Sequence, residues 1–116
     1  MHIDIQSPHF SVTRAMRSHT DRQLRLALTF CDEHIRRIVV RLSDINGPRG
    51  GPDKCCHLQV TLFGLHDVII EDVEADLYVA IDRTASRAAQ SIRRHLTRRR
   101  DRGRKLDHED ATLVAE

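Results

Sequence analysis

The sequence contains no tryptophan, and its aromatic side chains are three phenylalanines and one tyrosine among 116 residues. So few rings disfavour the class of proteins that stack unpaired nucleobases on an aromatic sheet surface. No apolar run approaches the roughly 20 residues that a membrane-spanning helix requires. The amino terminus, MHIDIQSPHF, also lacks the basic segment and the apolar segment of a secretory signal. We therefore expect a cytoplasmic protein that does not associate with membranes.

Cysteine is also scarce, and the three cysteines have neither the number nor the spacing of a disulfide framework or a C-x-x-C zinc site. Cys55, Cys56 and His57 are consecutive on a predicted strand, so their side chains alternate between its faces and cannot converge on one metal. This pattern predicts a buried Cys56 and a partly exposed Cys55. Cys55 and His66 could in principle form a nucleophile and base, but no orienting residue or oxyanion site is identifiable. We expect no enzyme activity, metal, cofactor or small-molecule substrate.

The length of 116 residues suits one small domain. Hydrophobic residues make up 40% of the chain and charged residues 31%, as in soluble globular proteins. From residue 106 onward the sequence LDHEDATLVAE is acidic and has no periodic apolar stripe, which is typical of a frayed end. We expect a folded domain over residues 1–102 and a short polar tail over residues 103–116.

Acidic and basic residues are separated along the chain. The formal net charge is only +2, yet residues 66–82 contain six acidic residues and no Lys or Arg. Residues 83–105 contain ten basic residues and a single acidic one. Of the 19 basic residues 17 are arginine, whose forked guanidinium group suits contacts with phosphate. The chain therefore carries one strongly acidic and one strongly basic segment.

Periodic patterns of apolar residues predict six elements. Four segments alternate as strands do, and two carry apolar stripes at helical spacing. In chain order they are a strand at residues 2–6, a helix at 13–30, strands at 35–45, 55–63 and 66–74, and a helix after Asp76. The long connection between the first two strands makes them candidates for parallel neighbours. We expect an α+β fold of order β-α-β-β-β-α, with both helices packed on one face of a four-stranded sheet.

The last predicted helix gathers its arginines on one side. At about 100° per residue, four of them fall within an arc of roughly 60°, opposite the apolar stripe: Arg83, Arg87, Arg94 and Arg98. A helix that is merely solvated would interleave acidic residues at four-residue spacing, yet residues 83–100 contain none. Like charges at this density favour an anionic partner, and nucleic acid is the strongest candidate.

Three motifs resemble those of the ribosome hibernation promoting factor and ribosome-associated inhibitor family. DLYVAID at residues 76–82 is similar to the family's D-[ML]-Y-x-A-I-D signature, which precedes a basic helix. SVTRAMR at residues 11–17 resembles the family's V-T-x-A-L-R helix start, and HIRRIVVRLSD at residues 34–44 resembles its second strand. The similarity covers about residues 1–102, and the family's element order agrees with the order predicted above.

The resemblance implies a short-form hibernation factor without catalytic activity. Family members sit on the small ribosomal subunit between head and body, where they occupy the space of mRNA and tRNA and silence idle ribosomes under stress or in stationary phase. The candidate rRNA-binding residues are Arg17, Arg22, Arg25, Arg83, Arg87, Arg94 and Arg98. Two other interpretations stay open at this point. One is a protein-interaction regulator that acts through the acidic segment 66–82, and the other is a generic double-stranded RNA-binding module.

Overall fold

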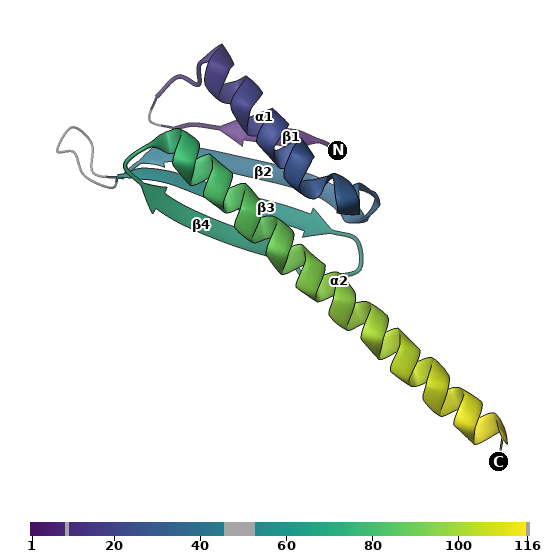
Figure 1. Ribbon diagram of the computed structural model, residues 1–116. Helices are drawn as coiled ribbons and strands as arrows, with labels where there is room; N and C mark the ends of the chain where they lie inside the picture. Colours follow the sequence, from purple (N-terminus) through teal and green to yellow (C-terminus); the bar gives the residue numbers. More distant parts are fainter. Residues whose placement is uncertain (9, 46–52, 116) are drawn as a thin grey trace.

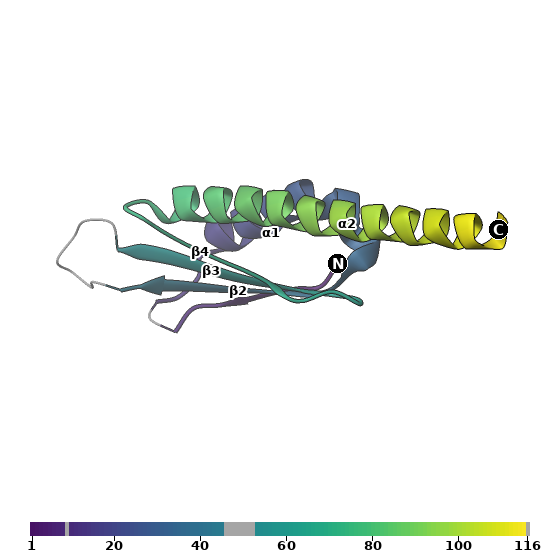
Figure 2. The same cartoon turned by 90° about the horizontal axis from the view of Figure 1, so that it is seen from below.

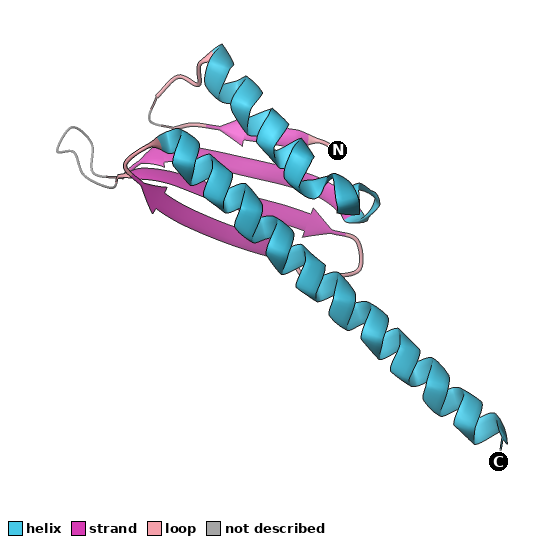
Figure 3. Ribbon diagram, in the orientation of Figure 1, coloured by secondary structure: helices cyan, strands magenta, loops and turns pink. Residues whose placement is uncertain are grey.

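The computed structural model describes the backbone of residues 1–8, 10–45 and 53–115, and the side chains of this set up to Asp101. The elements are β1 (Ile3–Gln6), α1 (Arg14–Leu28), the 3-10 helix η1 (Thr29–His34), β2 (Ile35–Asp44), β3 (Lys54–Leu62), β4 (Val68–Glu74) and α2 (Leu77–Ala115). This arrangement confirms the predicted α+β fold (Figures 1 and 3). The structure adds η1, which the sequence patterns did not distinguish from the first helix.

The four strands form one mixed sheet in the order β1-β2-β3-β4. β1 lies parallel to β2, with Ile3 opposite Ile38, because α1 and η1 carry the chain back along the sheet before β2 begins. The β2–β3 and β3–β4 pairs are antiparallel. The predicted parallel pairing of the first two strands is therefore confirmed.

Both helices pack on one face of the sheet, and Figure 2 shows them as a second layer above it. The strands alternate between this layer and solvent. Ile38, Val40 and Leu42 of β2 are at most 1% exposed, whereas Arg37 and Arg41 are exposed on the open face. The helices fill the other half of the core with Leu24 and Leu28 of α1 and Leu77, Ile81, Ala85, Ala88 and Ile92 of α2. Truncation of a large side chain in this core costs about 2–5 kcal/mol.

The DLYVAID segment starts α2 and joins it to α1. The Asp76 carboxylate accepts a hydrogen bond from the backbone N–H of Tyr78 at 2.8 Å, which caps the helix. The Tyr78 ring meets the His19 ring of α1 edge-on, with 4.8 Å between centroids. His19 Nε2 also lies 2.7 Å from the Asp82 carboxylate. The motif therefore sets both the start of α2 and its packing against α1.

α2 extends far beyond the sheet that it covers (Figure 1). Among its described side chains, which run to Asp101, the last buried residue is Ile92, and Leu96 is half-buried against the core. The prediction of a frayed end from residue 106 is wrong for the backbone, which stays helical to Ala115 because the segment has no proline and many helix-forming residues. The domain boundary at residue 102 stays a prediction. Over the described residues, neither α2 nor any other helix has the length and apolar character of a membrane span.

Candidate nucleic-acid interface

The four arginines predicted to share one side of α2 are all exposed: Arg83, Arg87, Arg94 and Arg98. They lie on the flank of α2 that faces the β4 edge of the sheet. Arg83 and Arg87 show this directly, since both contact residues of β4. The opposite flank of α2 contacts α1 through Tyr78 and Asp82. The basic side is therefore open to a partner along the β4 edge.

The first two arginines of this side already have acidic partners. Arg83 Nη1 donates to the Glu74 carboxylate at 2.9 Å. Arg87 Nη1 donates to the Glu71 backbone carbonyl at 3.0 Å and lies 3.6 Å from the Asp72 carboxylate. Part of the positive charge at the start of α2 is therefore neutralised within the domain.

Arg94 and Arg98 differ from these two. Neither makes a hydrogen bond or ion pair with any residue that the structure describes. A guanidinium without a carboxylate partner keeps its full charge for an external anion and loses no internal bond when it binds one. The strongest candidates for phosphate contact on this side are therefore these two.

Asp72 is the most perturbed carboxyl group beside this surface. Burial, the hydrogen bond with Glu74 and the charge of Glu74 raise its pKa, while Arg83 and Arg87 act in the opposite direction. One of its oxygens, Oδ2, is buried and has no hydrogen-bond partner among the described residues. The positive charges beside Asp72 therefore offset only part of the cost of burying its negative charge.

The acidic segment 66–82 is largely occupied by contacts inside the domain. Asp67 accepts a hydrogen bond from Gln59, Asp76 caps α2, and Asp82 contacts His19. Asp72 and Glu74 face the arginines of α2 as described above. Few of these carboxylates remain free to bind another protein, which weighs against the acidic segment as the working surface.

The three candidates on α1 are also exposed: Arg17, Arg22 and Arg25. Gln23 and Ala27 line a groove between the helices and so mark the side of α1 that faces α2. Arg25 is two residues from each, about 200° around the helix, and therefore points away from α2. Its Nε donates to Asp21 at 2.8 Å, and this bond, together with the charge of Asp21, raises the pKa of Arg25. The seven candidates thus do not form one continuous patch.

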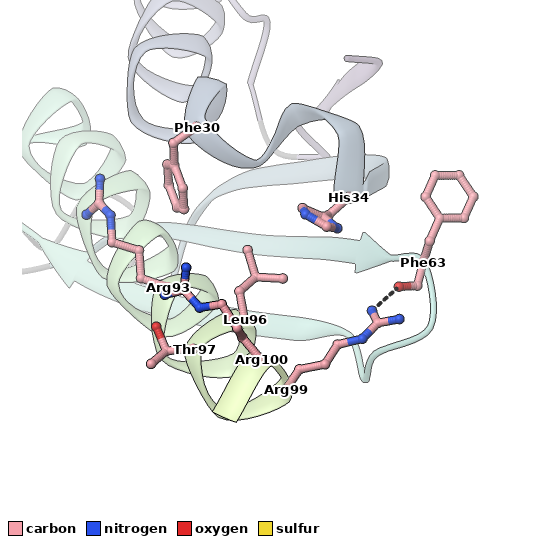
Figure 4. Close-up of a pocket in the computed structure, with 8 residues that line it drawn as sticks. All are labelled: Phe30, His34, Phe63, Arg93, Leu96, Thr97, Arg99 and Arg100. Carbon is pink, nitrogen blue, oxygen red and sulfur yellow. Dashed lines mark hydrogen bonds between the residues drawn. The ribbon is translucent and has the colours of Figure 1, made fainter. Parts of the chain in front are cut away.

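Three further arginines, which the sequence analysis did not single out, converge at the end of the sheet. Arg93, Arg99 and Arg100 line a hollow of about 820 Å³ together with Phe30, His34, Phe63, Leu96 and Thr97 (Figure 4). In the sequence, Arg99 and Arg100 belong to a run of three arginines at residues 98–100. Because consecutive residues of a helix point about 100° apart, the three side chains leave α2 in different directions. The same 100° spacing places Arg93 and Arg100 about 20° apart but Arg99 about 100° away from Arg100, so no pattern in the sequence predicts that the three line one hollow.

The cysteines are buried and poorly suited to chemistry. Burial raises the pKa of Cys31 to about 11 and that of Cys56 to about 12. Cys55 is 5% exposed, so the prediction that it is partly exposed is wrong; burial again raises its pKa first, followed by the charge of Glu71. The described residues contain no group of three or more His, Cys, Asp or Glu residues placed to hold a metal.

Cys55 and His66 are not neighbours across the sheet. Cys55 pairs with Val73, whereas the last pair of that ladder is Val60 with Val68. His66 precedes β4 and lies beyond that far end of the hairpin. Strand geometry places Cys55 and Val60 roughly 17 Å apart, so the two side chains cannot form a nucleophile and base.

Comparison with known proteins shows the family to which this chain is similar. The model of the family described as sigma 54 modulation protein / S30EA ribosomal protein matches residues 3–100, which include every strand, α1 and the first part of α2. The N-terminal domain of Protein Y from Thermus thermophilus is 28% identical with a TM-score of 0.68, over 82% of this chain and 99% of that one. A ribosomal subunit interface protein from Coxiella burnetii is 20% identical with a TM-score of 0.73, over 84% and 99%, and supports the fold. No protein of curated function matches the chain.

Proposed function

We propose that this chain, which belongs to the sigma 54 modulation protein / S30EA ribosomal protein family, binds rRNA of the small ribosomal subunit in the mRNA and tRNA channel. By occupying that channel it inhibits translation and preserves idle ribosomes under stress or in stationary phase. The protein is a non-enzymatic, cytoplasmic factor that needs no cofactor. The observation that carries the proposal is the set of arginines on α2 that have no carboxylate partner within the described part of the chain.

The binding energy comes from phosphate contacts. A guanidinium group binds phosphate through two parallel hydrogen bonds, and each contact displaces counterions from the RNA. Arg94 and Arg98 on the β4 side of α2 supply such groups, and the exposed Arg17 and Arg22 on α1 add others. All four project from helices that are packed on a sheet, so the backbone positions from which they reach the RNA are fixed by the fold.

The paired arginines have a smaller part in this proposal. Arg83, Arg87 and Arg25 contact acidic side chains of the domain itself. To reach a phosphate each must share or break that contact, so the net gain per residue is lower than for a free guanidinium. We therefore rank these three below the four arginines named above.

The mode of inhibition is steric. Burial raises the pKa of the Cys31 and Cys56 thiols to about 11 and about 12, so neither is a thiolate nucleophile at neutral pH. The protein acts instead by filling space that mRNA and tRNA need. Release of the protein then restores an unmodified ribosome.

Sedimentation with purified small subunits over a salt series tests the proposal. We expect the protein to sediment with the subunits, and its affinity to fall by about 10³-fold or more between about 50 and 200 mM salt if six or more phosphates are contacted. An excess of a plain RNA duplex should not displace it. Equal displacement by the duplex would indicate a generic double-stranded RNA-binding module, and salt-independent binding would indicate a protein partner.

A further inference from the structure

The hollow at the end of the sheet combines aromatic and cationic side chains. Phe30 and Phe63 are 44% and 55% exposed, which is unusual for such large apolar groups. They come from η1 and from the turn after β3, and α2 contributes the other lining residues except His34 (Figure 4). Two of the three phenylalanines of the chain therefore lie in a single surface feature.

Two arginines of the hollow contact its phenylalanine residues. The Arg93 guanidinium carbon lies 4.3 Å from the centre of the Phe30 ring, a cation–π contact. Arg99 Nη1 lies 3.5 Å from the backbone carbonyl of Phe63, toward which it donates. Gly64, at φ 72°, directly follows Phe63 in the turn between β3 and β4. Among the described residues no acidic side chain lines the hollow, so none of them opposes the charge of its guanidinium groups.

This combination suits a nucleotide better than other ligands. A nucleobase presents a flat π surface that stacks on an aromatic ring, and its phosphate needs a cation close to that ring. The Phe63 ring makes no ring contact or cation–π contact with any described residue, so its faces are available. Arg99 lies beside it, and the volume of about 820 Å³ is within the range of roughly 300–1,000 Å³ that ligand sites occupy.

We propose that the hollow holds one unstacked nucleotide of single-stranded RNA. The base stacks on Phe63, Arg99 and Arg100 bind the adjacent phosphates, and the Phe30–Arg93 pair forms the opposite wall. The inference rests on the proposed function and adds to it a contact with a base, where the scarcity of aromatic residues had favoured recognition of backbone and shape alone. It also explains why the exposed rings and the guanidinium groups occur together in this hollow.

The absence of tryptophan from the chain allows a direct test. In Phe63→Trp the single indole reports stacking by fluorescence quenching, and Ile69→Trp is the matched control, since Ile69 is 58% exposed but lies on β4 opposite Gln59, away from the hollow. The probes are octauridylate and an abasic ribose-phosphate oligomer of the same length and charge. We expect octauridylate to quench the tryptophan fluorescence of Phe63→Trp and the abasic oligomer to leave it unchanged. Neither oligomer should quench the fluorescence of Ile69→Trp.

A second measurement gives the size of the contact. Phe63→Ala should weaken octauridylate binding by about 5- to 150-fold, as expected for one stacked base, and should leave binding of the abasic oligomer unchanged. Equal quenching at positions 63 and 69, or no loss of affinity in Phe63→Ala, would overturn the inference. So would quenching by an acidic peptide with aromatic residues and not by RNA, which would assign the hollow to a protein partner.

The two proposals fail in different ways. Suppose that wild-type protein sediments with small subunits, but octauridylate does not quench the fluorescence of Phe63→Trp and binds Phe63→Ala as well as wild type. The base contact is then wrong and the ribosome proposal stands. If octauridylate binds through Phe63 but the protein does not sediment with small subunits, the ribosome proposal is wrong and the nucleotide site stands.

Discussion

The arginines at the start of α2 and those further along it have the same chemistry but different surroundings. Arg83 and Arg87 contact carboxylate or carbonyl oxygens of β4 at 2.9 and 3.0 Å. Arg94 and Arg98 have no such contact within the described residues, although they lie on the same side of the helix. The availability of a positive charge is therefore decided by what lies beside it as well as by its place on the helical wheel.

The geometry of the strand explains this difference. α2 follows β4 after a short turn and runs back along it, so that four helical residues, about 6 Å, correspond to about two strand residues. Arg83 meets Glu74, and Arg87 meets Glu71 and Asp72. Further along, β4 offers only Ile70, Ile69 and Val68, which have no carboxylate. The acidic residues of β4 thus neutralise the first part of the basic side and leave the later part free.

The largest expected effect on ribosome binding comes from removing the charges of Arg94 and Arg98. Arg94→Gln with Arg98→Gln removes two free guanidinium groups, and at about 1.5–3 kcal/mol per charged contact the dissociation constant for small subunits should rise about 10²- to 10⁴-fold. The salt dependence of binding should decrease by about one unit of slope per arginine. Neither side chain contacts the core, so thermal unfolding should not change. Sedimentation and circular dichroism measure both quantities.

The matched control is Arg83→Gln with Arg87→Gln. Here the same number of charges is removed, but binding should weaken less than tenfold, and stability should fall by about 1 kcal/mol because Glu74 and Asp72 lose their partners. Equal loss of binding in the two double variants would contradict the distinction between paired and free arginines.

A smaller effect is expected from Asp72→Asn, measured as a pH dependence of stability. Burial raises the folded-state pKa of Asp72 above its ordinary value of 3.8, so the folded protein binds this proton more tightly than the unfolded chain does. The wild-type protein therefore loses stability as pH rises from 3.8 through the raised pKa, and Asp72→Asn removes that loss. Urea unfolding should show equal stabilities at about pH 3 and a more stable variant at neutral pH. A less stable variant at neutral pH would mean that the contact with Arg87 outweighs the cost of burial.

The smallest effect is expected when the chain is shortened to residues 1–102, which tests the predicted domain boundary. The segment removed has two basic and four acidic residues, and among the side chains that the structure describes the last buried residue of α2 is Ile92. We expect an unchanged midpoint of thermal unfolding and equal or slightly tighter binding to small subunits. A clear loss of either property would place the boundary later in the chain and give the end of α2 a part in the interface.

Much of the fold could be predicted because it depends on local patterns. Alternation predicted a strand over residues 35–45, and the alternate residues Ile38, Val40 and Leu42 are all buried. A helix was predicted from residue 13, and the Thr13 side chain caps α1 by accepting a hydrogen bond from the Met16 backbone N–H. These features depend only on the backbone geometry of a few neighbouring residues, so the sequence is enough to predict them.

The site was less predictable, because its members come from distant parts of the chain. The sequence by itself determined the element order, the buried faces and the presence of an arginine side on α2, since each follows from a period of two or 3.6 residues. Only the tertiary structure decided that β4 neutralises Arg83 and Arg87, that Cys55 is buried, and that Phe30, Phe63 and Arg93 meet in one hollow. Such encounters are set by how the two layers pack, and no local period encodes the distance between residues that lie on different helices and strands.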